Sequence, residues 1–175
     1  MPLLLKTILS VLVVAAGVYD LRTRKIPNWL NLSGIVLGLG LNTLFAHGPG
    51  VSLAVCGLLF SLAVYVPLYL MRGMGAGDVK LMAAVGALAG PQNWLGIFVI
   101  TALLGGACSL ILIFLRRQAR RTFLNVGFIL HELLHARMPS HARPQLDIRN
   151  RDALRLPHGT VIAAGSLAYL FLAGR

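Results

Sequence analysis

The stretch GMGAGDVKLM, residues 73–82, places three glycines before an aspartate, and an apolar run starts directly after that aspartate. Glycine clusters favour irregular backbone, so the stretch predicts a loop that leads into an apolar helix near Asp78. The chain holds only five Asp and Glu residues in 175, so a carboxylate at the start of a hydrophobic segment requires an explanation. Ionisable side chains near membrane depth are costly and usually mark a functional site.

The composition of the chain is typical of an integral membrane protein. Hydrophobic residues make up 57% of it, charged residues make up 12%, and the mean hydropathy is +0.79. A soluble domain carries about a quarter charged residues. The net charge of +11 does not indicate a nucleic-acid partner, because the basic residues lie between apolar segments, where membrane topology explains them. We therefore expect one all-α, membrane-embedded domain that spans residues 1–175.

Six apolar segments predict the helices of this domain. A helix that crosses the hydrocarbon core needs about 20 apolar residues. The expected helices cover residues 3–19, 29–46, 51–71, 79–89, 94–115 and 158–173. The fourth is too short to cross alone, at about 12 residues or roughly 18 Å if it ends at the turn near Pro91. Because the hydrocarbon core is about 30 Å thick, Asp78 should then lie below the cytoplasmic surface, inside the protein.

The basic residues indicate the orientation of these helices. Of the 16 Lys and Arg residues, 14 lie in connectors on one side of the expected bundle, and the opposite connectors, near His47 and Gly90, carry none. Cytoplasmic loops are enriched in Lys and Arg. We therefore expect a multi-pass membrane protein with both termini facing outward.

Residues 116–156 form the one sizeable polar region and are expected to be a cytoplasmic loop. Within this region, the apolar stretch FLNVGFILHELLHARM, residues 123–138, is flanked by basic residues. This pattern favours a helix that lies on the membrane surface and is attracted to anionic lipids, which we expect as partners.

Two of the acidic residues, Asp20 and Asp78, lie at the ends of apolar segments on the same side of the expected bundle. Two carboxylates brought together in a low-dielectric site share a proton. Such a pair can hydrolyse a peptide, because one carboxylate accepts a proton from water while the other donates one to the substrate carbonyl. The simpler alternatives are that Asp78 only caps a helix and that Asp20 only pairs with Arg22 or Arg24.

Three stretches of the chain resemble the type IV prepilin peptidases, which are intramembrane aspartyl peptidases. GAGDVKL, residues 75–81, resembles the GxGD motif. YDLRTRKIPN, residues 19–28, resembles the family's other motif, an Asp followed by basic residues and I-P-N. LPHGTVIAAG, residues 156–165, resembles the family's last helix, although His158 stands where relatives more often carry an aromatic residue. The resemblance covers the whole chain.

The resemblance implies an endopeptidase that removes the leader from type IV prepilins or pseudopilins. Cleavage would take place at the cytoplasmic face of the bacterial inner membrane. The resemblance also implies that Asp20 and Asp78 are the catalytic pair. The further motif positions are Gly75, Gly77, Lys80, Pro27 and Asn28.

Longer members of that family carry an N-terminal cytoplasmic insertion with two CxxC pairs, and they also methylate the new N-terminus. This chain has neither the insertion nor a CxxC pair, and its two cysteines, Cys56 and Cys108, are expected to be buried apolar residues. We therefore expect cleavage without methyl transfer, with no metal and no cofactor. The small size is similar to that of the branch that serves Flp-type (Tad) pili.

Three basic residues, Arg22, Arg24 and Lys25, follow Asp20 closely. They are candidates for binding the substrate or the headgroups of anionic lipids. The alternative is that they only anchor the cytoplasmic side of the first helix.

The stretch HELLH, residues 131–135, supports a competing hypothesis. It matches the HExxH motif, in which two His side chains on one helix face bind zinc and the Glu is a general base. A catalytic zinc site requires a third protein ligand, and the candidates His141 and Asp147 belong to no recognisable second motif. A zinc metallopeptidase is therefore one alternative, and a non-enzymatic subunit or carrier that moves protons through Asp20 and Asp78 is another.

Overall fold

The computed structural model of the chain describes residues 1–71, 73–115 and 157–174, without the side chains of residues 47 and 48. These residues form the helices α1 (Leu3–Thr23), α2 (Asn28–Leu70), α3 (Ala76–Leu115) and α6 (His158–Leu172). No strand occurs in the ranges described, which agrees with the expected all-α class. Residues 116–156, with the expected surface helix and the HELLH stretch, lie outside them.

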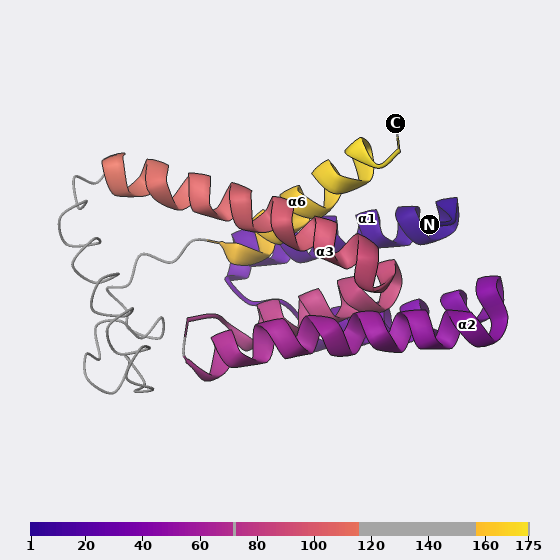
Figure 1. The fold of residues 1–175 in the computed structure, drawn as a ribbon. Coiled ribbons are helices and arrows are strands. Elements are labelled where there is room, and N and C mark those ends of the chain that lie inside the picture. Colours follow the sequence, from indigo (N-terminus) through magenta and orange to yellow (C-terminus); the bar gives the residue numbers. More distant parts are fainter. Residues whose placement is uncertain (72, 116–156, 175) are drawn as a thin grey trace, which may run out of the picture.

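The long element α2 reverses direction near its middle. A Cβ atom added to Gly50 would overlap the carbonyl oxygen of Asn42, although residues eight apart in a straight helix are separated by about 12 Å. By length and composition, the element contains two candidate membrane spans, Asn28–Ala46 and Pro49–Leu70. Figure 1 shows α2 running from the end of the bundle that holds the loop before α3 to the opposite end and back.

The element α3 also folds back on itself. Its backbone breaks at Gly90, which has a φ of 74° and a ψ of 168°, and Pro91 follows. Glycine tolerates this positive φ, whereas an L side chain would be strained there. Beyond the break, the indole N–H of the fully buried Trp94 donates a hydrogen bond of 3.2 Å to the carbonyl oxygen of Met82. The two halves of α3 therefore pack against each other.

Within residues 1–71, 73–115 and 157–174, four helical segments are long and apolar enough to cross a membrane, so the expected count of six is not confirmed. The difference has two causes. α3 counts as one 40-residue segment despite the break at Gly90. α6 has 15 residues, or about 22 Å, which is short for a hydrocarbon core of about 30 Å.

Helices α2 and α3 cross where two glycines meet. A Cβ atom on Gly86 would overlap the carbonyl oxygen of Gly57, and a Cβ atom on Gly57 would overlap the carbonyl oxygen of Gly86. Small residues at a crossing let two membrane helices approach closely and gain van der Waals contacts. This crossing holds the first half of α3, which carries Asp78, against the second half of α2.

Gly86→Ala is therefore expected to destabilise the fold by about 1–3 kcal/mol, because the new methyl group would push two backbones apart. Gly40→Ala is the matched control, since a Cβ atom there meets nothing within 4 Å. The control is expected to be neutral or to stabilise by about 0.4–1 kcal/mol. Thermal unfolding of the detergent-solubilised variants measures both effects, and equal stability of the two would contradict the crossing described.

The helix ends and the cysteines differ from expectation. α1 continues to Thr23 and α3 begins at Ala76, so Asp20 and Asp78 both lie inside helices.

Cys56 and Cys108 are exposed, and their expected burial was wrong. The surface of a membrane helix faces lipid and is as apolar as the core, so an apolar context does not indicate burial. Figure 1 shows both chain termini at one end of the bundle and the loop before α3 at the other.

Candidate active site

Asp20 lies in the last turns of α1 and is only 7% exposed. Its carboxylate oxygen Oδ2 accepts a hydrogen bond of 3.2 Å from the backbone N–H of Thr160, in the first turn of α6. The Thr160 hydroxyl in turn donates a bond of 3.3 Å to the carbonyl oxygen of Gly17. The start of α6 therefore holds the end of α1, and the α6 backbone contacts the acid directly.

Gly159 makes this contact possible, and sequence reasoning missed it. A Cβ atom on Gly159 would lie 3.1 Å from both Cβ and Cγ of Asp20 and 2.9 Å from Cδ1 of Ile26. Both separations are tighter than ordinary contacts between carbon atoms, which lie at about 3.5–4.0 Å. The only signal in the sequence was that Gly159 lies in the stretch LPHGTVIAAG.

Asp78 is the third residue of α3 and is partly buried. Its carboxylate accepts a hydrogen bond from the backbone N–H of Gly75, and its own backbone N–H donates a bond of 3.2 Å to the Gly75 carbonyl oxygen. This reciprocal pairing resembles a capping box, in which the third helical residue bonds back to the N-cap residue. The alternative that Asp78 caps a helix therefore describes part of what this side chain does.

The structure also brings Asp78 and Asp20 together. The two carboxylates lie close enough to interact electrostatically. Asp20 lies near the C-terminal end of α1, and Asp78 lies in the first turn of α3. Capping alone does not require this proximity. α6 packs against both α1 and α3, which are the helices that carry the two acids.

The remaining motif residues link the two motif stretches to each other. The Lys80 ammonium group donates a hydrogen bond of 2.9 Å to the side-chain oxygen of Asn28. The side-chain amide of Asn31, a buried residue, lies 3.5 Å from the carbonyl oxygen of Gly77. Pro27 occupies the N-cap position of α2. The I-P-N stretch therefore packs beside the glycine-rich stretch and supports the loop before Asp78.

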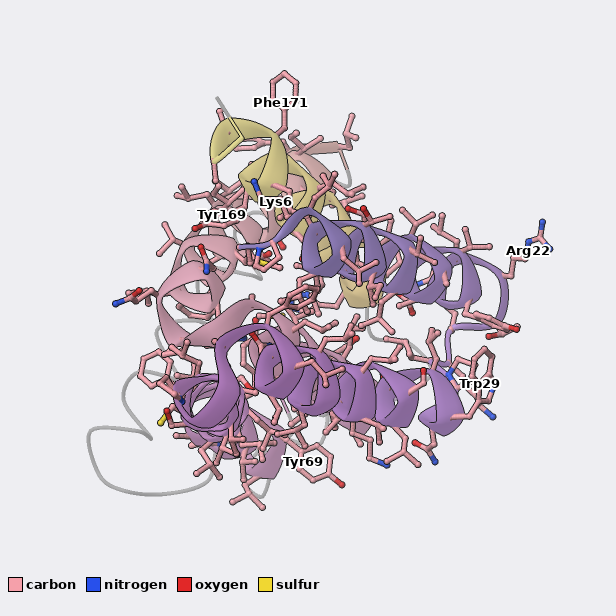
Figure 2. The ribbon with its side chains drawn as sticks, turned by 90° about the vertical axis from the view of Figure 1, so that its right-hand side faces the viewer. Lys6, Arg22, Trp29, Tyr69, Tyr169 and Phe171 are labelled. Carbon is pink, nitrogen blue, oxygen red and sulfur yellow. The ribbon has the colours of Figure 1, made fainter. Side chains whose placement is uncertain are left out.

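The three basic residues after Asp20 lie at the surface of the same end of the bundle. Arg22, Arg24 and Lys25 are all exposed. Figure 2 shows Arg22 pointing away from the helices, above Trp29. These side chains therefore belong to the surface of the bundle end at which α1 ends.

Two further side chains near the carboxylates were missed from the sequence as site residues. Tyr65 of α2 is 2% exposed and interacts electrostatically with Asp78. His158, the first residue of α6, interacts electrostatically with Asp20. Tyr65 gives no signal in the sequence, because it is one aromatic residue within an apolar span. His158 was visible only as a departure from the pattern of the last helix.

Among residues 1–71, 73–115 and 157–174, no group of three or more His, Cys, Asp and Glu side chains could hold a metal ion. The HELLH stretch lies outside these ranges. The zinc alternative for residues 131–135 therefore stays a prediction.

The fold and the site define a class of protein: a helical membrane protein with two neighbouring carboxylates at one end of its bundle. The chain belongs to the type IV leader peptidase family, whose family model matches residues 7–110. It is 31% identical over 126 residues to a prepilin leader peptidase/N-methyltransferase of Xanthomonas campestris pv. campestris. That match covers 69% of this chain and 44% of the relative, so the chain spans less than half of that protein. No solved structure matches the chain.

The family match confirms the resemblance predicted from the motifs. The matched residues include both Asp20 and Asp78. They do not include α6, which supplies the backbone N–H to Asp20.

Proposed function

We propose that the protein is an aspartic endopeptidase that removes the leader peptide from type IV prepilins or pseudopilins, of the Flp/Tad type. The observation that carries this proposal is the electrostatic interaction between Asp20 and Asp78, both within the residues matched by the leader peptidase family. The prepilin peptidase activity of the relative supports the choice of substrate.

In the proposed reaction, the two carboxylates share one proton and act on one water molecule. The ionised carboxylate takes a proton from water as the water oxygen bonds to the scissile carbonyl carbon, and the protonated carboxylate donates its proton to the carbonyl oxygen. The C–N bond of the resulting diol then breaks as the protonated carboxyl group gives its proton to the leaving amine. The other carboxylate takes the proton of one diol hydroxyl, which forms the carboxylic acid product and restores the pair. The backbone N–H groups of Thr160 and Gly75 orient one carboxylate each.

The proposed topology is a single domain, residues 1–175, with about six transmembrane helices in the bacterial inner membrane, of which the fourth is short. Because α2 reverses direction and α3 breaks at Gly90, each of these two elements supplies two membrane helices. With α1 and α6, this gives the proposed six. We place the carboxylate end at the cytoplasmic face, because Arg22, Arg24 and Lys25 lie there. Both termini lie at the opposite end of the bundle and would face outward (Figure 1).

We propose that cleavage takes place without N-methylation and without a metal or cofactor. The connector between α1 and α2 has only the four residues 24–27, so it holds no inserted module at that place. The chain also contains no CxxC pair. The product should therefore carry a free, unmethylated amino group, which intact-mass measurement of the cleaved pilin would reveal.

The exposed basic residues at the carboxylate end would contact the polar part of the leader, the headgroups of anionic lipids, or both. Arg22, Arg24 and Lys25 carry charge of the right sign for lipid phosphates and for acidic groups of a leader. No part of this proposal involves a nucleic acid.

Co-expression of the protein with a panel of candidate prepilins, in a host that lacks its own prepilin peptidase, tests the proposed function. We expect at least one prepilin to shift to a smaller product on a gel, and cleavage to persist in the presence of a metal chelator. Loss of cleavage both with chelator and in His131→Ala would favour the zinc alternative. Failure to process any prepilin, while the protein accumulates in the membrane, would contradict the proposal.

A further inference from the structure

A groove of about 280 Å³ has Tyr65 and His158 among its lining residues. Its walls come from four separate parts of the chain: the end of α2, the loop before α3, the second half of α3 and the start of α6. The apolar wall residues include Leu68, Phe98 and Ala102, and two adjacent glycines, Gly105 and Gly106, leave its outer side open. Ala102 and Gly106 are exposed, so the groove opens on the side of the bundle that faces lipid.

The groove is connected to both acids through residues that line it. Tyr65 interacts electrostatically with Asp78, and His158 interacts electrostatically with Asp20. Met74, a third lining residue, directly precedes the Gly75 that bonds to Asp78. A group that enters the groove from the lipid side therefore reaches the neighbourhood of the catalytic pair.

We propose that this groove binds an apolar side chain of the substrate that lies next to the scissile bond. This inference rests on the proposed function. Binding sites for small molecules have volumes of about 300–1,000 Å³, so a groove of about 280 Å³ suits one or two side chains and not a whole helix. The apolar walls favour an apolar side chain, because burying it removes apolar surface from water or from loosely packed lipid.

Gly106 lines the groove and offers a position at which a larger side chain can fill it. A Cβ atom on Gly106 meets nothing within 4 Å, and one on Gly105 would make an ordinary contact of 3.5 Å with Cγ1 of Val161. A larger side chain at position 106 can therefore be accommodated by the protein itself while it occupies space that the substrate needs. Gly40 offers a matched control, because it is also an exposed helical glycine with nothing within 4 Å of a Cβ atom.

The test compares Gly106→Leu and Gly40→Leu in the full chain, with the prepilin that the wild-type protein cleaves. We expect Gly106→Leu to lower kcat/KM at least tenfold with normal abundance, and Gly40→Leu to match the wild type. Replacing the apolar substrate residue next to the scissile bond with Ala should restore part of the lost rate in Gly106→Leu only. Equal rates for the two Leu variants would overturn the proposed subsite.

A second measurement does not depend on catalysis or on the Leu variants. A photo-crosslinking amino acid is placed at position 106 or at position 40 of the Asp78→Asn protein, in membranes that contain the same prepilin. We expect a crosslinked prepilin from position 106 and none from position 40. Crosslinks from position 106 to lipid alone would show that the groove is a lipid site and would overturn the inference.

The two proposals fail in different ways. If the wild-type protein cleaves no prepilin, the proposed function fails and this inference falls with it. If the wild-type protein cleaves a prepilin and Gly106→Leu cleaves it equally well, only the subsite is wrong.

Discussion

Asp20→Asn and Asp78→Asn should each lower the rate of prepilin cleavage by about 10²–10⁴-fold, the range typical for loss of a general acid or base. An amide can neither accept the proton from water nor donate one to the substrate carbonyl. It does keep an oxygen that can accept the backbone hydrogen bond from Thr160 or from Gly75. The fold should therefore survive in both variants, and the loss should appear in kcat rather than in abundance.

The double variant sharpens this prediction. Two residues that act on one water molecule as a unit are strongly non-additive, so Asp20→Asn/Asp78→Asn should be no slower than the slower single variant. Asp152→Asn is the matched control, because Asp152 lies outside both motifs and the HELLH stretch, and it should cleave at the wild-type rate. If either single variant cleaved the prepilin at the wild-type rate, the aspartic mechanism would be excluded. Gel-shift time courses with purified membranes measure all four proteins.

Gly159→Ala should lower cleavage by about 10–100-fold, because the added methyl group would lie 3.1 Å from two carbon atoms of Asp20. The start of α6 or the Asp20 side chain must then shift, and the hydrogen bond from the Thr160 N–H to the carboxylate is the contact that suffers. A displacement of about 1 Å at a catalytic group can cost about 10²-fold in rate.

The control for this variant separates a displaced acid from a general loss of stability. Gly40→Ala makes the same substitution in open space and should leave cleavage unchanged. The unfolding temperature of Gly159→Ala should decrease only slightly, whereas its cleavage rate should decrease strongly. Cleavage and unfolding temperature that decrease in proportion would show instead that Gly159 is needed only for packing.

The sequence drew attention to the two acids, Asp20 and Asp78, for physical reasons. Asp20 and Asp78 interrupt strongly apolar segments, and the cost of a carboxylate at such positions draws attention to them. Two apolar segments, residues 29–46 and 51–71, lie between them, so the chain crosses the membrane twice and both acids are expected on the same side. The electrostatic interaction between the two side chains in the structure agrees with that placement. The catalytic role of the pair stays a prediction until the variants are measured.

The helix boundaries were harder to predict. The glycines before Asp78 indicated irregular backbone, yet α3 begins at Ala76, because the Asp78 carboxylate bonds back to the Gly75 N–H and stabilises the first turn. A local hydrogen bond thus overrides the weak helix propensity of glycine.

The residues that surround the acids could not be found from the sequence. Tyr65, Gly159 and His158 reach the site through helix packing. The last-helix stretch that contains Gly159 and His158 does not show that they contact the acids, and the local sequence of Tyr65 gives no signal. Apolar periodicity also gives little help, since lipid-facing and protein-facing sides of a membrane helix are equally apolar. The exposed Cys56 and Cys108 illustrate this ambiguity.

The hydrogen bond from Thr160 to Asp20 has a consequence for the order in which the protein matures. α1 and the first half of α3 leave the ribosome long before α6, which lies close to the end of the chain. During synthesis, Asp20 therefore lacks the hydrogen bond from Thr160 until α6 is made. Under the proposed function, the nascent chain would be inactive before that point. Proteolytic competence would begin when α6 docks, so a chain that still lacks α6 would not cut its neighbours in the bilayer.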